Sequence, residues 1–206
     1  MTGPRSNKAW LRRHVTDSYV RRARDAGYRS RAAYKLMEID DREHVFHKGD
    51  CVIDLGAAPG SWSQLAVQRV GPGGRVIAVD LLPITPISKV SVVQGDFRAL
   101  DLRDLVMAMA AGRVDVVLSD LAPNVSGIPL VDQARVAELV ELASDFALLV
   151  LKQNGIFVTK AFHGGAYSDL VQGLKNRFGE VAVRKPSASR GESRETYLVC
   201  RAPKKL

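Results

Sequence analysis

Short apolar runs alternate with longer amphipathic stretches along the chain from residue 51 onward. Five of these runs are rich in valine and isoleucine and predict strands: Cys51–Leu55, Arg75–Val79, Val90–Val93, Val114–Leu118 and Ile156–Thr159. The stretches between them predict helices over Ser61–Val70, Leu100–Ala111, Leu130–Leu151 and Tyr167–Phe178. Two last runs predict a closing pair of strands, Val181–Arg184 and Thr196–Cys200. This alternation predicts an α/β fold, a mainly parallel sheet with helices on both faces.

The composition predicts a single domain over residues 1–206, because 46% of the residues are hydrophobic and no repeat or long linker divides the chain. The longest apolar run, Phe146–Leu151, is too short to span a bilayer, and the N-terminus lacks the apolar stretch of a secretory signal. Cys51 and Cys200 lie in strand-like runs, which predicts buried free thiols and a cytoplasmic protein. The four histidines show no metal-ligand spacing, so we expect no metal.

The net charge is concentrated at the N-terminus. Residues 1–35 carry ten lysine and arginine side chains against two aspartates, so this segment accounts for the whole net charge of +8. Aromatic residues lie among the basic ones: Trp10, Tyr19, Tyr28 and Tyr34. Clustered arginine with aromatic rings suits phosphate contact and base stacking, although a basic arm that only aids solubility is the alternative. We predict an RNA-binding extension at about residues 1–30.

A glycine-rich turn follows the first predicted strand, in the segment Asp54-Leu-Gly-Ala-Ala-Pro-Gly-Ser-Trp62. Such a turn between a strand and a helix lets a ligand approach the backbone closely. The segment lacks the Gly-Lys-Ser/Thr ending of a phosphate-binding loop, and its two glycines do not make the Gly-x-Gly-x-x-Gly fingerprint of dinucleotide sites. Pro59 also removes a backbone donor that a pyrophosphate would use. The sequence therefore favours a ligand without a pyrophosphate.

Aspartates fall at or near the carboxyl ends of four predicted strands: Asp54, Asp80, Asp96 and Asp120. Asp80 can accept hydrogen bonds from both hydroxyls of an adenosine ribose, and Asp96 can accept from an adenine amino group. Acidic clustering at this edge suits a positively charged ligand, and the sulfonium of S-adenosylmethionine is one. The alternative for each residue alone is a helix cap or a turn.

The chain resembles the FtsJ (RrmJ) family of RNA ribose 2′-O-methyltransferases from about Arg12 to Cys200. The resemblance rests on the glycine-rich segment, together with Tyr28-Arg-Ser-Arg-Ala-Ala-Tyr-Lys-Leu36, Ser119-Asp-Leu-Ala-Pro-Asn124 and Arg194-Glu-Thr-Tyr197. It implies a Rossmann-like class I methyltransferase fold, with a seven-stranded, mainly parallel sheet and a terminal antiparallel strand. It also implies that S-adenosylmethionine contacts Gly60, Trp62, Asp80, Asp96 and Asp120.

The resemblance further implies a catalytic tetrad of Lys35, Asp120, Lys160 and Glu195. Asp120 and Lys160 also stand at predicted strand ends, and Lys35 lies on the polar side of a predicted helix. Lys160 is the candidate base for a ribose hydroxyl, or else a cation that stabilises the developing alkoxide. The alternative to a catalytic role is an ordinary ion-pair network at the strand ends.

The function expected from these features is S-adenosylmethionine-dependent 2′-O-methylation of a ribose in large-subunit ribosomal RNA. The ribose expected is that of a uridine. The short chain is similar to the bacterial ribosomal-RNA members of the family. Two alternatives stay open: a tRNA or cap ribose methyltransferase, and a non-enzymatic RNA-binding factor for ribosome assembly. We expect a monomer that acts within the large ribosomal subunit.

Overall fold

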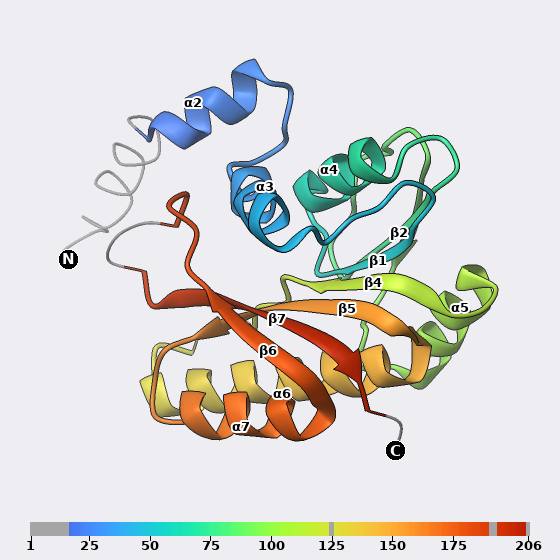
Figure 1. Cartoon of the computed structure of the whole chain (residues 1–206). Coiled ribbons are helices and arrows are strands. Elements are labelled where there is room, and N and C mark those ends of the chain that lie inside the picture. The colour runs from blue at the N-terminus through green and yellow to red at the C-terminus, as the bar shows by residue number, and fades with distance from the viewer. Residues whose placement is uncertain (1–16, 124–125, 190–192, 205–206) are drawn as a thin grey trace.

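A seven-stranded sheet lies at the centre of the molecule, in the order β3-β2-β1-β4-β5-β7-β6 (Figure 1). The computed structural model describes residues 17–123, 126–189 and 193–204. Its strands are β1 (Cys51–Leu55), β2 (Arg75–Asp80), β3 (Val90–Gln94), β4 (Val114–Ser119), β5 (Leu151–Phe162), β6 (Phe178–Arg184) and β7 (Glu195–Pro203). Neighbouring strands pair in parallel except β7, which is antiparallel to both β5 and β6. The predicted fold class is confirmed.

Helices cover both faces of this sheet. The helices of the described residues are α2 (Ser18–Asp25), α3 (Ala32–Glu43), α4 (Ser61–Val70), α5 (Leu100–Ala110), α6 (Pro129–Val150) and α7 (Tyr167–Arg177). Leu36 of α3 and Leu65 of α4 are buried on one face, whereas α5, α6 and α7 bury side chains such as Phe146 on the other. Cys51 and Cys200 are buried free thiols, as predicted. No helix in the described part of the chain is long and apolar enough to cross a membrane.

Two element boundaries differ from the predicted ones. β5 begins at Leu151, directly after α6, although the apolar run that predicted it starts only at Ile156. The polar residues between Leu151 and Ile156 are exposed, and the register with β4 shifts here, between Val114 and Val116. Because of this irregular pairing, their strand conformation produces no alternating pattern in the sequence. Phe178 begins β6 instead of ending α7, because its ring is fully buried and stacks on Phe157.

The polar face of α3 attaches the N-terminal part of the chain to the β6–β7 connection. The backbone N–H groups of Ser187 and Ala188 donate to the carboxylate of Glu38, and the guanidinium of Arg31 donates to the carbonyl of Ala188. Lys35, on the same helix, points to β7 instead. This arrangement fixes the side chain of Lys35 over the carboxyl edge of the sheet.

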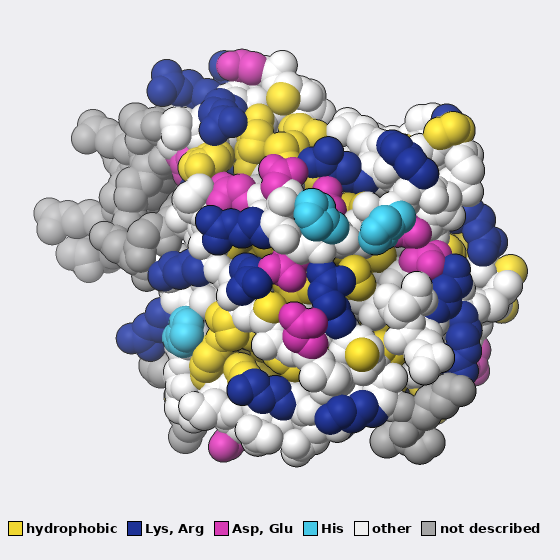
Figure 2. Space-filling model, in the orientation of Figure 1, with side chains coloured by type: hydrophobic (Ala, Val, Ile, Leu, Met, Phe, Trp, Pro, Cys, Tyr) yellow, Lys and Arg dark blue, Asp and Glu magenta, His cyan; other side chains and the backbone are white. Residues whose placement is uncertain are grey.

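Basic side chains project from α2, and others are scattered among acidic and apolar ones over the same face of the molecule (Figure 2). Arg21 and Arg24 are exposed, whereas the guanidinium of Arg22 lies 4.7 Å from the ring centre of Tyr34 and 5.3 Å from that of Tyr19. The basic and aromatic residues of the predicted extension before position 17 lie outside the described residues. The single-domain reading and the RNA-binding role of this segment stay predictions.

Candidate active site

The glycine-rich turn after β1 passes tightly against the end of β4. Gly56 has a φ of +74°, and a Cβ placed there would lie 2.8 Å from the backbone nitrogen of Leu121. Its own N–H donates to the carbonyl of Val79 in β2. Only glycine tolerates both this backbone conformation and this approach. The turn therefore joins three strand ends where the strand order reverses, which is the position at which such sheets bind ligands.

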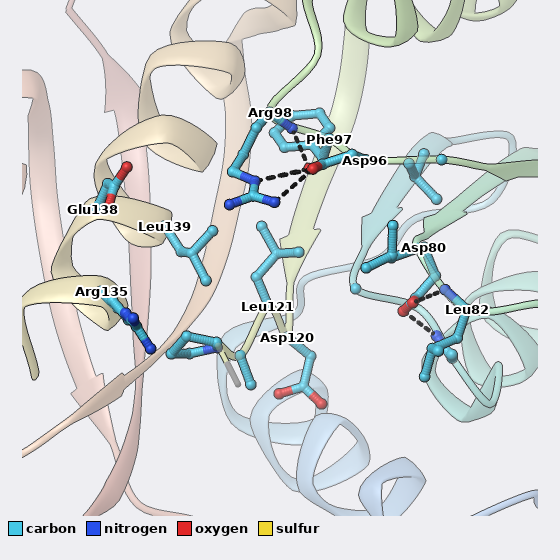
Figure 3. A pocket seen from close by; sticks show the side chains of 17 residues that line it. Asp80, Leu82, Asp96, Phe97, Arg98, Asp120, Leu121, Arg135, Glu138 and Leu139 are labelled. Atoms are coloured by element: carbon cyan, nitrogen blue, oxygen red, sulfur yellow. Dashed lines mark hydrogen bonds and ion pairs between the residues drawn. The ribbon is translucent and has the colours of Figure 1, made fainter. Parts of the chain in front are cut away.

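A cavity of about 560 Å³ opens beside this turn. It is formed by the residues that follow β1, β2, β3 and β4 and by one side of α6 (Figure 3). Three of the predicted cofactor-binding residues line it, namely Asp80, Asp96 and Asp120. The strand-end aspartates were expected to gather at one edge of the sheet, and for these three the structure shows that they do.

Asp80 is held in place by the backbone around it. Its two carboxylate oxygens accept hydrogen bonds from the N–H groups of Ala58 and Leu82, each at 2.8 Å. A carboxylate has about four acceptor positions, so two further bonds remain possible. Asp80 thus links the glycine-rich turn to the loop after β2 and presents acceptors to the cavity (Figure 3).

Asp96 is paired within its own loop. The guanidinium of Arg98 binds both of its oxygens, at 3.0, 3.1 and 2.6 Å, and the Arg98 N–H donates to Oδ1. The hydrogen bonds from Arg98 lower the pKa of Asp96 to about 2, so the group is a carboxylate at neutral pH. Arg98 is itself exposed at the cavity, so a ligand amino group has to share Asp96 with it.

Three other residues that the sequence singled out do not line the cavity. Asp54 is fully buried, where it accepts a hydrogen bond from Ser63 at 2.6 Å, and burial raises its pKa to about 7. The indole of Trp62 is 2% exposed and donates to the carbonyl of Ala32 in α3, so the side chain serves packing. Gly60 caps α4 beneath the side chain of Ile87. Any contact from Gly60 or Trp62 to a ligand would therefore involve the backbone.

Arg29 was not among the predicted site residues, yet it connects the two loops beside the cavity. Its guanidinium donates to the carbonyls of Pro59, Thr85 and Pro86 at 2.7 to 3.0 Å. These three carbonyl acceptors, which come from two loops, occupy much of the hydrogen-bonding capacity of the guanidinium. In the sequence, Arg29 was only one of ten basic residues near the N-terminus, and nothing in its spacing marks it as a clamp.

Lys160 and Asp120 form the first ion pair of the predicted tetrad. The amine Nζ of Lys160 lies 2.9 Å from Oδ1 of Asp120 and 2.9 Å from its backbone carbonyl oxygen. Lys160 is only 8% exposed, whereas Asp120 also lines the cavity. The pair stands where β4 and β5 end side by side, because Asp120 follows β4 and Lys160 is near the end of β5.

Lys35 and Glu195 form the second ion pair, with Nζ and Oε1 2.5 Å apart. The hydroxyl of Tyr197 donates to the same oxygen at 2.7 Å. Burial would raise the pKa of Glu195, but Lys35 and Tyr197 outweigh it and hold the pKa below its usual value. Tyr197 lies directly opposite Lys160 in the β5–β7 ladder, so both pairs belong to one face of the sheet. The structure thus brings all four predicted residues together.

The four charged side chains of the tetrad, two positive and two negative, can bind a polar group. They lie beside a cavity that can take a second molecule. Two lysines and two carboxylates, mostly shielded from water, make the electrostatic effect on a reacting oxygen larger than it would be in solution. Such a layout suits the transfer of a group from a ligand in the cavity to a hydroxyl at the tetrad.

Comparison with known proteins gives the family. Residues 28–202 match the family model of the FtsJ-like methyltransferases. The chain is 53% identical over 203 residues, covering 98% of it and 92% of the relative, to a ribosomal RNA large subunit methyltransferase E from Thiobacillus denitrificans. A protein of that name from Bordetella pertussis is 50% identical, with 95% and 96% covered.

A solved structure described as a ribosomal RNA methyltransferase from Plasmodium falciparum superposes with a TM-score of 0.76. It is 29% identical and covers 87% of this chain and all of its own. The family match spans the glycine-rich turn, the cavity aspartates and all four residues of the tetrad. On its sequence and its fold alike, the chain belongs to the FtsJ-like methyltransferase family.

Proposed function

We propose that this chain transfers a methyl group from S-adenosylmethionine to a ribose 2′-hydroxyl in large-subunit ribosomal RNA. Its relatives from Thiobacillus denitrificans and Bordetella pertussis are named ribosomal RNA large subunit methyltransferase E. The observation that carries the proposal is the Lys160–Asp120 pair, because Asp120 belongs both to the cavity and to the tetrad. One residue thereby links the place of the methyl donor to the place of the hydroxyl.

The cavity fits S-adenosylmethionine in size and in the hydrogen-bond acceptors that it offers. Its volume of about 560 Å³ lies within the usual range for small-molecule sites, about 300–1,000 Å³. Asp80 offers acceptors for ribose hydroxyls, and Asp96 offers them for an adenine amino group. Asp120, which lines the cavity, would supply a negative charge for the sulfonium.

The residues of the tetrad act on the hydroxyl. Bound S-adenosylmethionine supplies an electrophilic methyl group on its sulfonium. A lysine ammonium has three donors; Lys160 uses one of them on the backbone carbonyl of Asp120, and its charge pairs with Oδ1 of the same residue. A remaining donor can hold the reacting oxygen and steady its negative charge as the proton leaves to water, so we assign Lys160 this role in preference to that of a base. Lys35 and Glu195, which pair with each other, would position the ribose.

The narrower features of the substrate follow from the resemblance to the family. We propose a uridine as the methylated nucleoside and the large ribosomal subunit as the particle that presents it. The test is incubation of the protein with labelled S-adenosylmethionine and large subunits from cells that lack this methyltransferase. Label should enter the large-subunit RNA, and mapping of the modified nucleotide identifies the base. Label in small-subunit RNA or in tRNA alone would contradict the proposal.

Asp80→Ala is expected to weaken S-adenosylmethionine binding about tenfold to a hundredfold. The variant loses a charged acceptor, and such hydrogen bonds contribute about 1.5–3 kcal/mol. Titration calorimetry measures the dissociation constant, and urea unfolding verifies that the loop anchored by Asp80 still folds. Asp104→Ala is the matched control, because Asp104 is exposed on α5 and lies outside the cavity. An unchanged dissociation constant in folded Asp80→Ala would remove Asp80 from the cofactor site.

RNA affinity should depend less steeply on salt when Arg21 and Arg24 are replaced with alanine. Each phosphate contact that is lost flattens the slope of log affinity against log salt by roughly 0.7–0.9. Arg22 is left in place because it packs on Tyr19 and Tyr34. The control replaces Lys48 and Lys89, which are exposed at the opposite, amino-terminal edge of the sheet. Equal slopes in the two double variants would mean that α2 makes no phosphate contacts.

A further inference from the structure

A second, smaller cavity of about 160 Å³ lies between α6, the start of α7 and the end of β5. Its lining is almost entirely apolar and includes Val136, Ala137, Phe162, Ala166, Tyr167 and Leu170. It shares no lining residue with the cavity assigned to S-adenosylmethionine. At about half the lower limit of usual small-molecule sites, it has room for one ring system and no room for a whole cofactor.

The small cavity adjoins the tetrad through Phe162. The centre of the Phe162 ring lies 5.8 Å from Nζ of Lys160, and Phe162 pairs directly with Glu195 in the β5–β7 ladder. Tyr167 approaches from the other face of the sheet, since its hydroxyl accepts a hydrogen bond from Thr196, whose side chain points away from that of its neighbour Glu195. The cavity is therefore connected to the tetrad through Phe162. A ligand of the cavity would lie next to the Phe162 ring, which in turn lies beside the amine of Lys160.

The walls and the rim of the cavity suit a flat ring with a polar edge. The ring of Tyr167 packs against that of His163, with centres 4.1 Å apart, and His163 is exposed. At the rim, the side-chain amide of Gln133 accepts a hydrogen bond from the N–H of Gly165 and supplies further polar atoms. Nucleobases combine apolar faces with an edge of hydrogen-bonding groups, and proteins bind unpaired bases by aromatic stacking and by contacts to that edge.

We propose that this cavity binds a nucleobase of the RNA substrate, within one nucleotide of the ribose that is methylated. The inference rests on the proposed function, because the tetrad fixes where the reacting ribose lies. Seating a neighbouring base in this apolar cavity would fix the RNA strand and so help to hold the ribose hydroxyl, a poor nucleophile, in line with the methyl group. The cavity is thus a positioning subsite for the RNA, distinct from the basic surface of α2.

The test fills the cavity without touching the tetrad. Ala137 lines the cavity from a partly exposed position on α6, so Ala137→Trp places an indole where the base would lie. The matched control is Ala134→Trp, which adds the same bulk to an exposed position of the same helix that lines neither cavity. The measurements are the KM for undermethylated large ribosomal subunits, the dissociation constant for S-adenosylmethionine, and the urea midpoint of each variant.

We expect Ala137→Trp to raise the KM for large subunits roughly five- to hundredfold, the loss of one stacked base. Its affinity for S-adenosylmethionine and the kinetics of Ala134→Trp should stay within about twofold of the wild type. A folded Ala137→Trp with wild-type KM would overturn the inference, and so would an equal rise in both tryptophan variants. If Ala137→Trp does not fold, Tyr167→Leu and Tyr167→Phe decide, since only the leucine variant should raise the KM. Failure of the proposed function would differ, because the wild type itself would then not methylate large subunits.

Discussion

Replacing Lys160 with methionine is expected to slow methyl transfer about a hundredfold or more, while S-adenosylmethionine binds within about twofold of the wild type. Methionine keeps the length and apolar stem of the side chain but cannot donate to the reacting oxygen. The loss falls on kcat because the interaction matters only in the transition state. Lys160 lines no part of the cofactor cavity, which is why binding should be preserved. Single-turnover transfer to large subunits measures the rate.

Two further variants separate the role of Lys160 from general effects. Lys152→Met is the matched control, since Lys152 lies at the other end of β5 and pairs with Asp115 at the surface. It should leave the rate within about twofold. Lys160→Arg tests the chemistry, because arginine donates a charged hydrogen bond but cannot serve as a base. Partial activity of Lys160→Arg supports charge stabilisation, whereas inactivity equal to that of Lys160→Met indicates a base. A Lys160→Met variant as fast as the wild type would exclude a catalytic role.

Gly56→Ala is expected to lower the free energy of unfolding by about 2–5 kcal/mol and to abolish measurable cofactor binding. A left-handed backbone costs about 1–2 kcal/mol for a residue with a Cβ, and overpacking adds about 1–3 kcal/mol. Here the added Cβ would lie 2.8 Å from the backbone nitrogen of Leu121, and backbone atoms cannot move aside as a flexible side chain can. The glycine-rich turn would have to shift away from β4 and from the cavity.

Gly27→Ala separates the cost of the backbone conformation from the cost of overpacking. Gly27 has almost the same φ, +75°, but nothing lies within 4 Å of its added Cβ. It should cost only about 1–2 kcal/mol. Urea unfolding gives both values under identical conditions. If the two variants are equally stable, the close approach of the turn to Leu121 does not constrain the site. If Gly56→Ala binds S-adenosylmethionine normally, the turn does not shape the cavity.

The sequence was sufficient to predict the fold class and the chemistry at the edge of the sheet. Asp80 and Asp120 directly follow valine-rich runs, and the carboxyl ends of parallel strands meet, so their convergence follows from the order of the elements. The pairing of Lys35 with Glu195 could not follow from spacing, since 160 positions separate them along the chain. The resemblance to the family supplied that grouping.

What the sequence could not show is the direction in which a side chain points. Trp62 and Asp54 lie within the motif that predicted the ligand site, yet α3 covers the indole and the core encloses the carboxyl group. The glycine-rich turn fixes the backbone for the ligand, and its neighbouring side chains are then used for packing. Arg29 and the small apolar cavity were missed for a related reason, because each is made by segments that meet only in the folded chain.

The central claim, that the methyl group is placed on a ribose oxygen, is tested most directly by alkaline hydrolysis of labelled RNA. Large subunits are incubated with the protein and labelled S-adenosylmethionine, and their RNA is then hydrolysed completely. Alkali cleaves RNA through attack by the free 2′-oxygen, so a 2′-O-methyl group protects the next phosphodiester bond. If Lys35, Asp120, Lys160 and Glu195 act on a ribose hydroxyl, the label appears in alkali-resistant dinucleotides. Label recovered only in mononucleotides would mean methylation of a base and would contradict the account.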